Sequence, residues 1–264
     1  MVYKYYPPTD YTFDALCGEY FFFSKVRKLN DPYDTSFNLI RGSKLSKRLI
    51  AEGRISPDAD QIMNDYATCS FSAVKNSMHL WAFYANNFSG VVVGYDDSKF
   101  NEITESLKAR IFYYKVLYID KMFDVDKPFE FTLHNLTQGD KLICSDKLFK
   151  GDSKLDDDFF AYLYTIKHKA IWSEEMEYRL IAANDVVQQR DRLEMLGVKY
   201  TDAGYKIPMP NNVIKEIIIG HNFPKERIDH IKQIAHKNGI GSIKRTTALH
   251  PFIISFEDLS IDDI

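Results

Sequence analysis

Residues 171–181 read Ile-Trp-Ser-Glu-Glu-Met-Glu-Tyr-Arg-Leu-Ile, and the interpretation of the whole chain starts from this stretch. Its apolar end continues into Ala-Ala, which favours a strand. In an extended segment successive side chains alternate faces, so Glu175 and Glu177 would share one face while Met176 takes the other. Two carboxylates held that close raise each other's pKa, and catalysis often uses this effect. The alternative is a solvated strand end in which Arg179 is only a counter-ion.

The composition is that of a globular protein and carries no global signature of a macromolecular partner. The 264 residues are 45% hydrophobic, 27% charged and 14% aromatic, with a formal net charge of -3, so a basic nucleic-acid footprint is absent. The three cysteines form no CxxC pair or disulfide framework, and the histidines lack HxxxH or HExxH metal spacing. Without a signal peptide or a run of about 18 apolar residues, we expect a cytoplasmic chain with reduced thiols and no membrane partner.

Strand-like and helix-like segments alternate irregularly, which predicts one α+β domain over residues 1–264. Apolar or alternating runs indicate strands near residues 1–6, 20–26, 67–73, 90–95, 111–119 and 213–220. Helical spacing covers 98–110 and 224–238, and we also expect helices over Pro128–Leu148 and 156–169. The expected architecture is a mixed, mostly antiparallel sheet with helices inserted between its strands.

An ordered set of short motifs, spread over about residues 3–220, resembles a known family. The motifs are Lys4-Tyr5, Phe23-Ser24, Leu29-Asn30-Asp31-Pro32-Tyr33-Asp34, Cys69-Ser70-Phe71-Ser72, Leu80-Trp81-Ala82-Phe83-Tyr84-Ala85, Gly90-Val91-Val92-Val93-Gly94-Tyr95, and Trp172, Glu175, Glu177, Tyr178 and Arg179. In this order they resemble the bacterial family called domain of unknown function 2971. The name of that family implies little about activity.

A weaker similarity is to the ADP-ribosyltransferases. That superfamily places a basic residue or histidine on the first strand, a Ser or Tyr on a second core strand, and a Glu, often within Glu-x-Glu, on a later strand. Lys4, Ser70 (or Ser24) and Glu177 occur in this order, with Glu175-Met176-Glu177 as the Glu-x-Glu. Two departures are plain: Lys4 is neither Arg nor His, and a Ser-Phe-Ser triplet that includes Ser70 replaces Ser-Thr-Ser.

This similarity implies an ADP-ribosyltransferase-like fold and an NAD-dependent transferase or NAD hydrolase, in the role of a toxin or phage-defence effector with an unidentified acceptor. Glu177 would stabilise the positive charge that builds on the ribose, and Glu175 would activate the acceptor. Lys4 would contact the diphosphate or a ribose hydroxyl, while Tyr5 or Tyr84 would stack on a ring. The sequence has no G-x-G-x-x-G and no P-loop, so a nucleotide ligand would bind without either cradle.

Two other functions stay open at this point. Asp31 and Asp34, which follow Asn30 in a polar turn, could gather with the two glutamates around a divalent ion in a metal-dependent nuclease. The run Lys167-His168-Lys169 would then meet phosphate. Alternatively, the acidic cluster docks a basic partner in a non-catalytic binding module.

Several candidate residues also have a purely structural interpretation. Lys4 would protect an edge strand against aggregation. Ser70 and Ser72 would be small residues on a packed sheet. Trp81 would belong to the core, and Trp172 would anchor the preceding helix.

Overall fold

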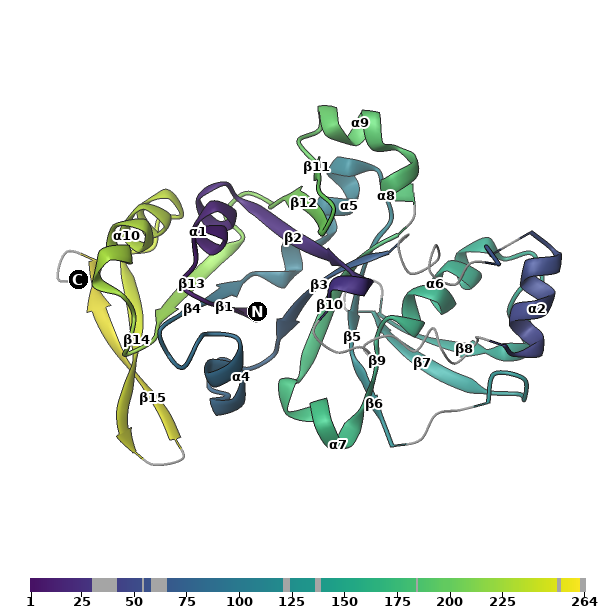
Figure 1. Cartoon of the computed structure of the whole chain (residues 1–264), viewed down its shortest axis with the longest axis horizontal. Coiled ribbons are helices and arrows are strands. Elements are labelled where there is room, and N and C mark those ends of the chain that lie inside the picture. The colour runs from purple at the N-terminus through teal and green to yellow at the C-terminus, as the bar shows by residue number, and fades with distance from the viewer. Residues whose placement is uncertain are drawn as a thin grey trace.

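The computed structural model describes residues 1–29, 42–53, 55–57, 66–120, 124–135, 139–183, 185–250 and 253–261. A long, mostly antiparallel sheet runs through these residues, and helices lie along it (Figure 1). This arrangement confirms the predicted α+β class with a mixed sheet. No helix in these ranges is both long enough and apolar enough to cross a lipid bilayer.

The strands are β1 (Val2–Tyr6), β2 (Tyr20–Lys25), β3 (Ala67–Ser72), β4 (Val91–Tyr95), β5 (Ile111–Lys115), β6 (Leu117–Ile119), β7 (Glu130–Asn135), β8 (Gly139–Cys144), β9 (Ile166–His168), β10 (Glu177–Ala182), β11 (Lys199–Tyr200), β12 (Gly204–Pro208), β13 (Ile214–Ile219), β14 (Ser242–His250) and β15 (Ile253–Ser260). Within the described ranges the main sheet follows the order β15-β14-β13-β4-β1-β3-β10-β5-β7-β8, and β2, β12 and β11 branch from β3. Strands β13 and β14 pair in parallel, and β6 and β9 form a separate parallel pair.

The helices connect these strands. The α-helices are α1 (Asp10–Cys17), α2 (Lys44–Ala51), α4 (Met78–Phe83), α5 (Asn101–Leu107), α6 (Ser153–Leu163), α7 (Lys169–Trp172), α8 (Asp185–Gln188), α9 (Arg190–Met195) and α10 (Ile228–Lys237). The 3-10 helices are η1 (Val26–Lys28), η3 (Asp97–Lys99), η4 (Ser145–Lys147), η5 (Ser173–Glu175) and η6 (Lys225–Arg227). The helices α1 and α10 pack side by side near one end of the sheet (Figure 1).

Strand β3 lies at a fork in the sheet. One of its edges pairs with β10, which places Ser72 opposite Glu177. The other edge is shared between two strands: its start pairs with β2, where Thr68 opposes Ser24, and its end pairs with β1, where Ser72 opposes Tyr3. Neither β1 nor β2 pairs with the three residues between these points. The middle of β3 is therefore where the two strands separate.

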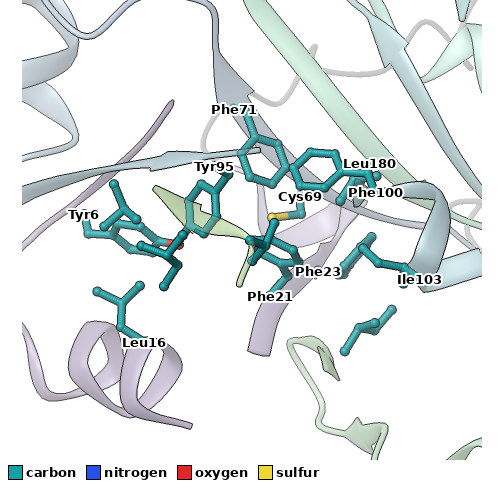
Figure 2. Packing of buried hydrophobic residues seen from close by; sticks show 14 of the residues in the cluster. Tyr6, Leu16, Phe21, Phe23, Cys69, Phe71, Tyr95, Phe100, Ile103 and Leu180 are labelled. Carbon is teal, nitrogen blue, oxygen red and sulfur yellow. The ribbon is translucent and has the colours of Figure 1, made fainter. Parts of the chain in front are cut away.

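Every second side chain of the central strands enters a large hydrophobic core. Phe21 and Phe23 of β2 pack there with Cys69 and Phe71 of β3 and with Leu180 of β10 (Figure 2). The rings of Phe21 and Phe71 meet edge to face with centroids 5.4 Å apart, a favoured aromatic geometry. Because side chains of a strand alternate faces, the intervening residues of β3 and β10 lie on the opposite face of the sheet.

The predicted helix over Pro128–Leu148 is wrong, because this segment contains the hairpin of β7 and β8. Phe131 and Leu133 are buried at alternate positions of β7, and Ile143 of β8 is fully buried. They form a second core with Phe159 of α6. Apolar residues at every second position are typical of a strand, but the charged residues scattered through the segment obscured this period and led to the helix prediction.

The segment before β10 is helical rather than extended, which corrects the interpretation of residues 171–176. The helices α7 and η5 occupy it, and the strand begins only at Glu177. Met176 joins η5 to the strand with a φ of 45°, in the left-handed region that non-glycine residues rarely adopt. Its carbonyl accepts a hydrogen bond from the Ala73 N–H at 3.0 Å. A tight turn, and not strand alternation, thus brings Glu175 and Glu177 together.

Candidate functional site

A cavity of about 210 Å³ lies at the fork beside β3. Residues of β1, β2, β3, α4, β9 and the turn into β10 line it. Eight of the residues that the sequence singled out are among them: Lys4, Tyr5, Ser24, Ser70, Tyr84, Trp172, Glu175 and Glu177. The fold therefore gathers side chains from both ends of the predicted motif set in one place.

Two buried carboxylates and two buried cations form a compact cluster at this cavity. Glu177 accepts two hydrogen bonds from the Arg179 guanidinium, at 2.6 Å from Nε and 3.0 Å from Nη2. The Lys167 ammonium lies 2.7 Å from Glu177 Oε2 and 2.9 Å from Glu175 Oε2. None of the four side chains belongs to a residue more than 7% exposed. Their formal charges cancel, which is how a protein can hold charges in its interior.

The cations determine the protonation of Glu177. Burial alone would raise the pKa of its carboxyl, but the charges and hydrogen bonds of Arg179 and Lys167 outweigh burial and lower this pKa to about 2. The expectation that the neighbouring carboxylates raise each other's pKa is therefore wrong for Glu177. Arg179 is the counter-ion of the alternative interpretation, yet this strand end is buried rather than solvated.

Glu175 is held from several sides. Tyr84, which directly follows α4, donates its hydroxyl to Glu175 Oε1 at 2.9 Å, and the Ser72 hydroxyl donates to the Glu175 backbone carbonyl at 2.7 Å. The Lys167 ammonium also lies 4.9 Å from the ring centroid of Trp172, which lines the cavity. Ser72 and Trp172 thus position the charged cluster, so each has a structural role next to the cavity.

Lys4 lies in the interior of the sheet. Its strand β1 pairs with β4 on one side and with β3 on the other, so the interpretation of Lys4 as an edge-strand lysine is wrong. The ammonium donates to the Ser70 carbonyl at 2.9 Å and lies 5.7 Å and 5.5 Å from the ring centroids of Tyr6 and Phe71. In the described part of the chain, no carboxylate makes an ion pair with it. Lys4 therefore adds a positive charge to the cavity wall.

The remaining candidates differ in their relation to the cavity. Tyr5 lines it, but its hydroxyl donates to a backbone carbonyl and its ring packs edge-on against Trp81, with centroids 5.7 Å apart. Trp81 is fully buried in a small core and does not line the cavity, as its structural interpretation expects. Asn30, Asp31 and Asp34 lie outside the described residues.

Lys167 and Thr68 are among the lining residues that were not expected at this site. Lys167, expected only as a phosphate contact of a nuclease, instead bridges the two glutamates. No local pattern indicates this contact, because it depends on how β9 lies against the turn before β10. Thr68 is two residues before Ser70 on the same strand, so extending the alternation of β3 by one step would have included it.

Fold and site together define an α+β protein with a charge-lined cavity where its central strands separate. The family described as "Protein of unknown function (DUF2971)" matches residues 80–180, which run from α4 into β10 and contain Tyr84, Lys167 and both glutamates. This match supports the resemblance to that family. No match was found among curated proteins or among solved structures.

Proposed function

We propose that the cavity binds NAD and that the chain is an NAD-dependent ADP-ribosyltransferase or NAD hydrolase. The observation that carries this proposal is Glu177, an ionised carboxylate held by Arg179 and Lys167 on the wall of a cavity that also contains the Lys4 ammonium. A carboxylate fixed in advance beside a developing positive charge needs no reorganisation during the reaction. Such preorganised charge is among the largest contributions to enzymatic rate.

The reaction breaks the bond between C1′ of the ribose and the nicotinamide nitrogen, which keeps the bonding electron pair. Positive charge develops on the ribose, and a water molecule or an acceptor group then bonds to C1′ and releases a proton. In our proposal Glu177 faces the charged ribose and accepts a hydrogen bond from one of its hydroxyls. Glu175 accepts the proton from the attacking group.

The glutamates have the capacity for these roles. A carboxylate offers about four acceptor positions. Three contacts from Arg179 and Lys167 reach Glu177, and two contacts from Lys167 and Tyr84 reach Glu175. The cavity, at about 210 Å³, is smaller than typical ligand pockets of roughly 300–1,000 Å³. It therefore suits the nicotinamide-ribose part and the phosphate next to it, with the rest of NAD extending beyond the cavity.

Nicotinamide release from NAD by the purified chain is the direct test, together with the thermal shift that NAD produces. We expect release by the wild type and a loss of about a hundredfold or more in Glu177→Gln. Glu174→Gln is the matched control, because Glu174 is the exposed neighbour in η5. Circular dichroism of each variant separates a loss of activity from a loss of fold. A wild type that neither releases nicotinamide nor gains stability with NAD would contradict the proposal.

The two alternative functions receive less support. Cations already neutralise Glu175 and Glu177, and within the described ranges no three His, Cys, Asp or Glu side chains gather as a metal site would require. A nuclease would therefore have to draw on Asp31 and Asp34, outside those ranges. A binding module that docks a basic partner needs exposed carboxylates, whereas these two glutamates are buried.

A further inference from the structure

The cavity contains a buried hydroxyl group without a hydrogen-bond partner. Thr68 of β3 is 2% exposed and lines the cavity, and its Oγ1 makes no hydrogen bond with any described residue. Buried hydroxyls are normally paired, because removing one from water without a partner is unfavourable. The buried Thr165 follows this rule by donating to the Tyr162 carbonyl at 2.8 Å. Valine has the same shape as threonine and would bury no unpaired hydroxyl. The presence of threonine at position 68 therefore indicates that a ligand pairs with this hydroxyl.

Two more hydroxyls lie beside Thr68. Ser24 opposes it on β2, and Ser70 follows two residues later on the same face of β3. Both serines line the cavity, and neither hydroxyl makes a hydrogen bond with the described residues. Ser72 differs, because its hydroxyl donates to the Glu175 carbonyl and accepts from the Val74 N–H. The hydroxyl groups that are available to bind a ligand thus lie at the end of β3 that is away from the glutamates.

The same end of the cavity carries a positive charge. The Lys4 ammonium is fixed at the Ser70 carbonyl, at 2.9 Å, and has two further N–H donors. The glutamate end, by contrast, has two carboxylates balanced by Lys167 and Arg179. An ammonium that shares a cavity with hydroxyl donors is complementary to an oxyanion, and much less so to a neutral sugar.

We propose that Lys4 and the hydroxyls of Ser24, Thr68 and Ser70 bind a phosphate group of the ligand. Along β3 this group would lie about 7–13 Å from Ser72, since each residue of a strand advances about 3.3 Å. A ligand that reaches both ends of the cavity carries a sugar at the glutamates and a phosphate at Thr68. The inference rests on the proposed function, because it assigns a second part of the same cavity to the same ligand, and it makes Thr68 a specificity-determining residue.

The experiment measures, by isothermal titration calorimetry, the affinity of the full chain for inorganic pyrophosphate and, separately, for NAD. Thr68→Val removes the hydroxyl and keeps the side-chain shape. We expect the affinity for both ligands to fall about tenfold or more. Without ligand, the variant should melt at the same or a higher temperature, because an unpaired buried hydroxyl has been removed. A loss of fold therefore cannot explain the loss of binding.

Thr247→Val is the matched control. The Thr247 hydroxyl is also buried and unpaired among the described residues, but it belongs to β14 and does not line the cavity. We expect this control to leave both affinities unchanged. Equal losses in the two variants would overturn the inference.

The remaining outcomes separate this inference from the proposed function. Binding of NAD with undiminished affinity by Thr68→Val would overturn the phosphate site and leave the proposed function standing. Binding of pyrophosphate that depends on Thr68, in a chain that does not bind NAD, would support the phosphate site and overturn the proposed function. If neither ligand binds the wild type at millimolar concentration, both are overturned.

Discussion

Replacing Glu177 by Gln removes one negative charge from a buried cluster of two carboxylates and two cations. The cost follows from the pKa of this carboxyl, which falls from 4.5 to about 2 in the folded chain because of Arg179 and Lys167. A tenfold change in proton affinity corresponds to about 1.4 kcal/mol. The interactions of the ionised carboxylate therefore contribute about 3 kcal/mol to the free energy of unfolding at pH 7. A similar value is typical when one partner of a buried ion pair is removed, about 3–5 kcal/mol.

The same pKa gives the pH dependence of this effect. A carboxyl whose pKa is lowered by folding stabilises the folded chain fully above its unfolded pKa of 4.5. That stabilisation is lost as the pH falls through 4.5 toward about 2, because the wild-type carboxyl becomes protonated and then resembles glutamine. The difference between wild type and Glu177→Gln should accordingly shrink from about 3 kcal/mol at pH 7 to about 1 kcal/mol at pH 3.

Urea unfolding of both proteins at pH 7 and pH 3 measures this difference. Glu174→Gln provides the matched control, because Glu174 is exposed and forms no ion pair with a described residue. Its effect should stay within about 0.5 kcal/mol at both pH values. A difference for Glu177→Gln below about 1 kcal/mol at pH 7, or one that is the same at both pH values, would refute the assignment of Glu177 as an ionised member of a buried cluster.

Two further substitutions test the site and its frame. Lys167→Met leaves two buried carboxylates without their shared cation, so urea unfolding at pH 7 should show a loss of about 3–5 kcal/mol. Adding Glu175→Gln should restore part of this loss, and no restoration would contradict the bridge. Gly220→Ala would place a Cβ on the Phe88 carbonyl oxygen. We expect the free energy of unfolding to fall by about 2 kcal/mol and the melting temperature to fall by several degrees. Gly241→Ala has open space around its Cβ, and an equal fall there would argue against the packing.

The sequence was informative where strands have one buried face. Cys69 and Phe71 alternate with Ser70 and Ser72, and the fold sends the first pair into the core and the second pair to the cavity. Such a two-residue period is visible without knowledge of any distant contact. The strand predictions near the site could therefore be made from local pattern, whereas Lys4 and Ser70 were grouped only by the similarity to ADP-ribosyltransferases.

The electrostatics of the site could not be predicted in the same way. The pKa of Glu177 depends on Lys167, which lies on a different strand and reaches the carboxylate only after the chain has folded. The turn at Met176 adopts a left-handed φ that no residue preference of methionine indicates. Similarly, the charged residues around Phe131 and Leu133 concealed the strand alternation of β7. Each of these errors arose where a long-range contact, and not the local pattern, decided the structure.

The distribution of charge along the cavity favours a ligand that is held at one end and reacts at the other. Because Lys167 and Arg179 already neutralise the glutamates, a neutral sugar gains little electrostatic energy on binding beside Glu177. The same carboxylate would stabilise the sugar strongly only when positive charge develops on it. Binding strength would instead come from the Lys4 end, where an anionic group meets an ammonium that makes no ion pair with a described residue. Interactions that strengthen only in the transition state accelerate a reaction, whereas those already formed with the substrate do not. In the proposed function, a neutralised carboxylate pair at the reacting sugar and an ammonium at the phosphate would divide these two tasks between the ends of one cavity.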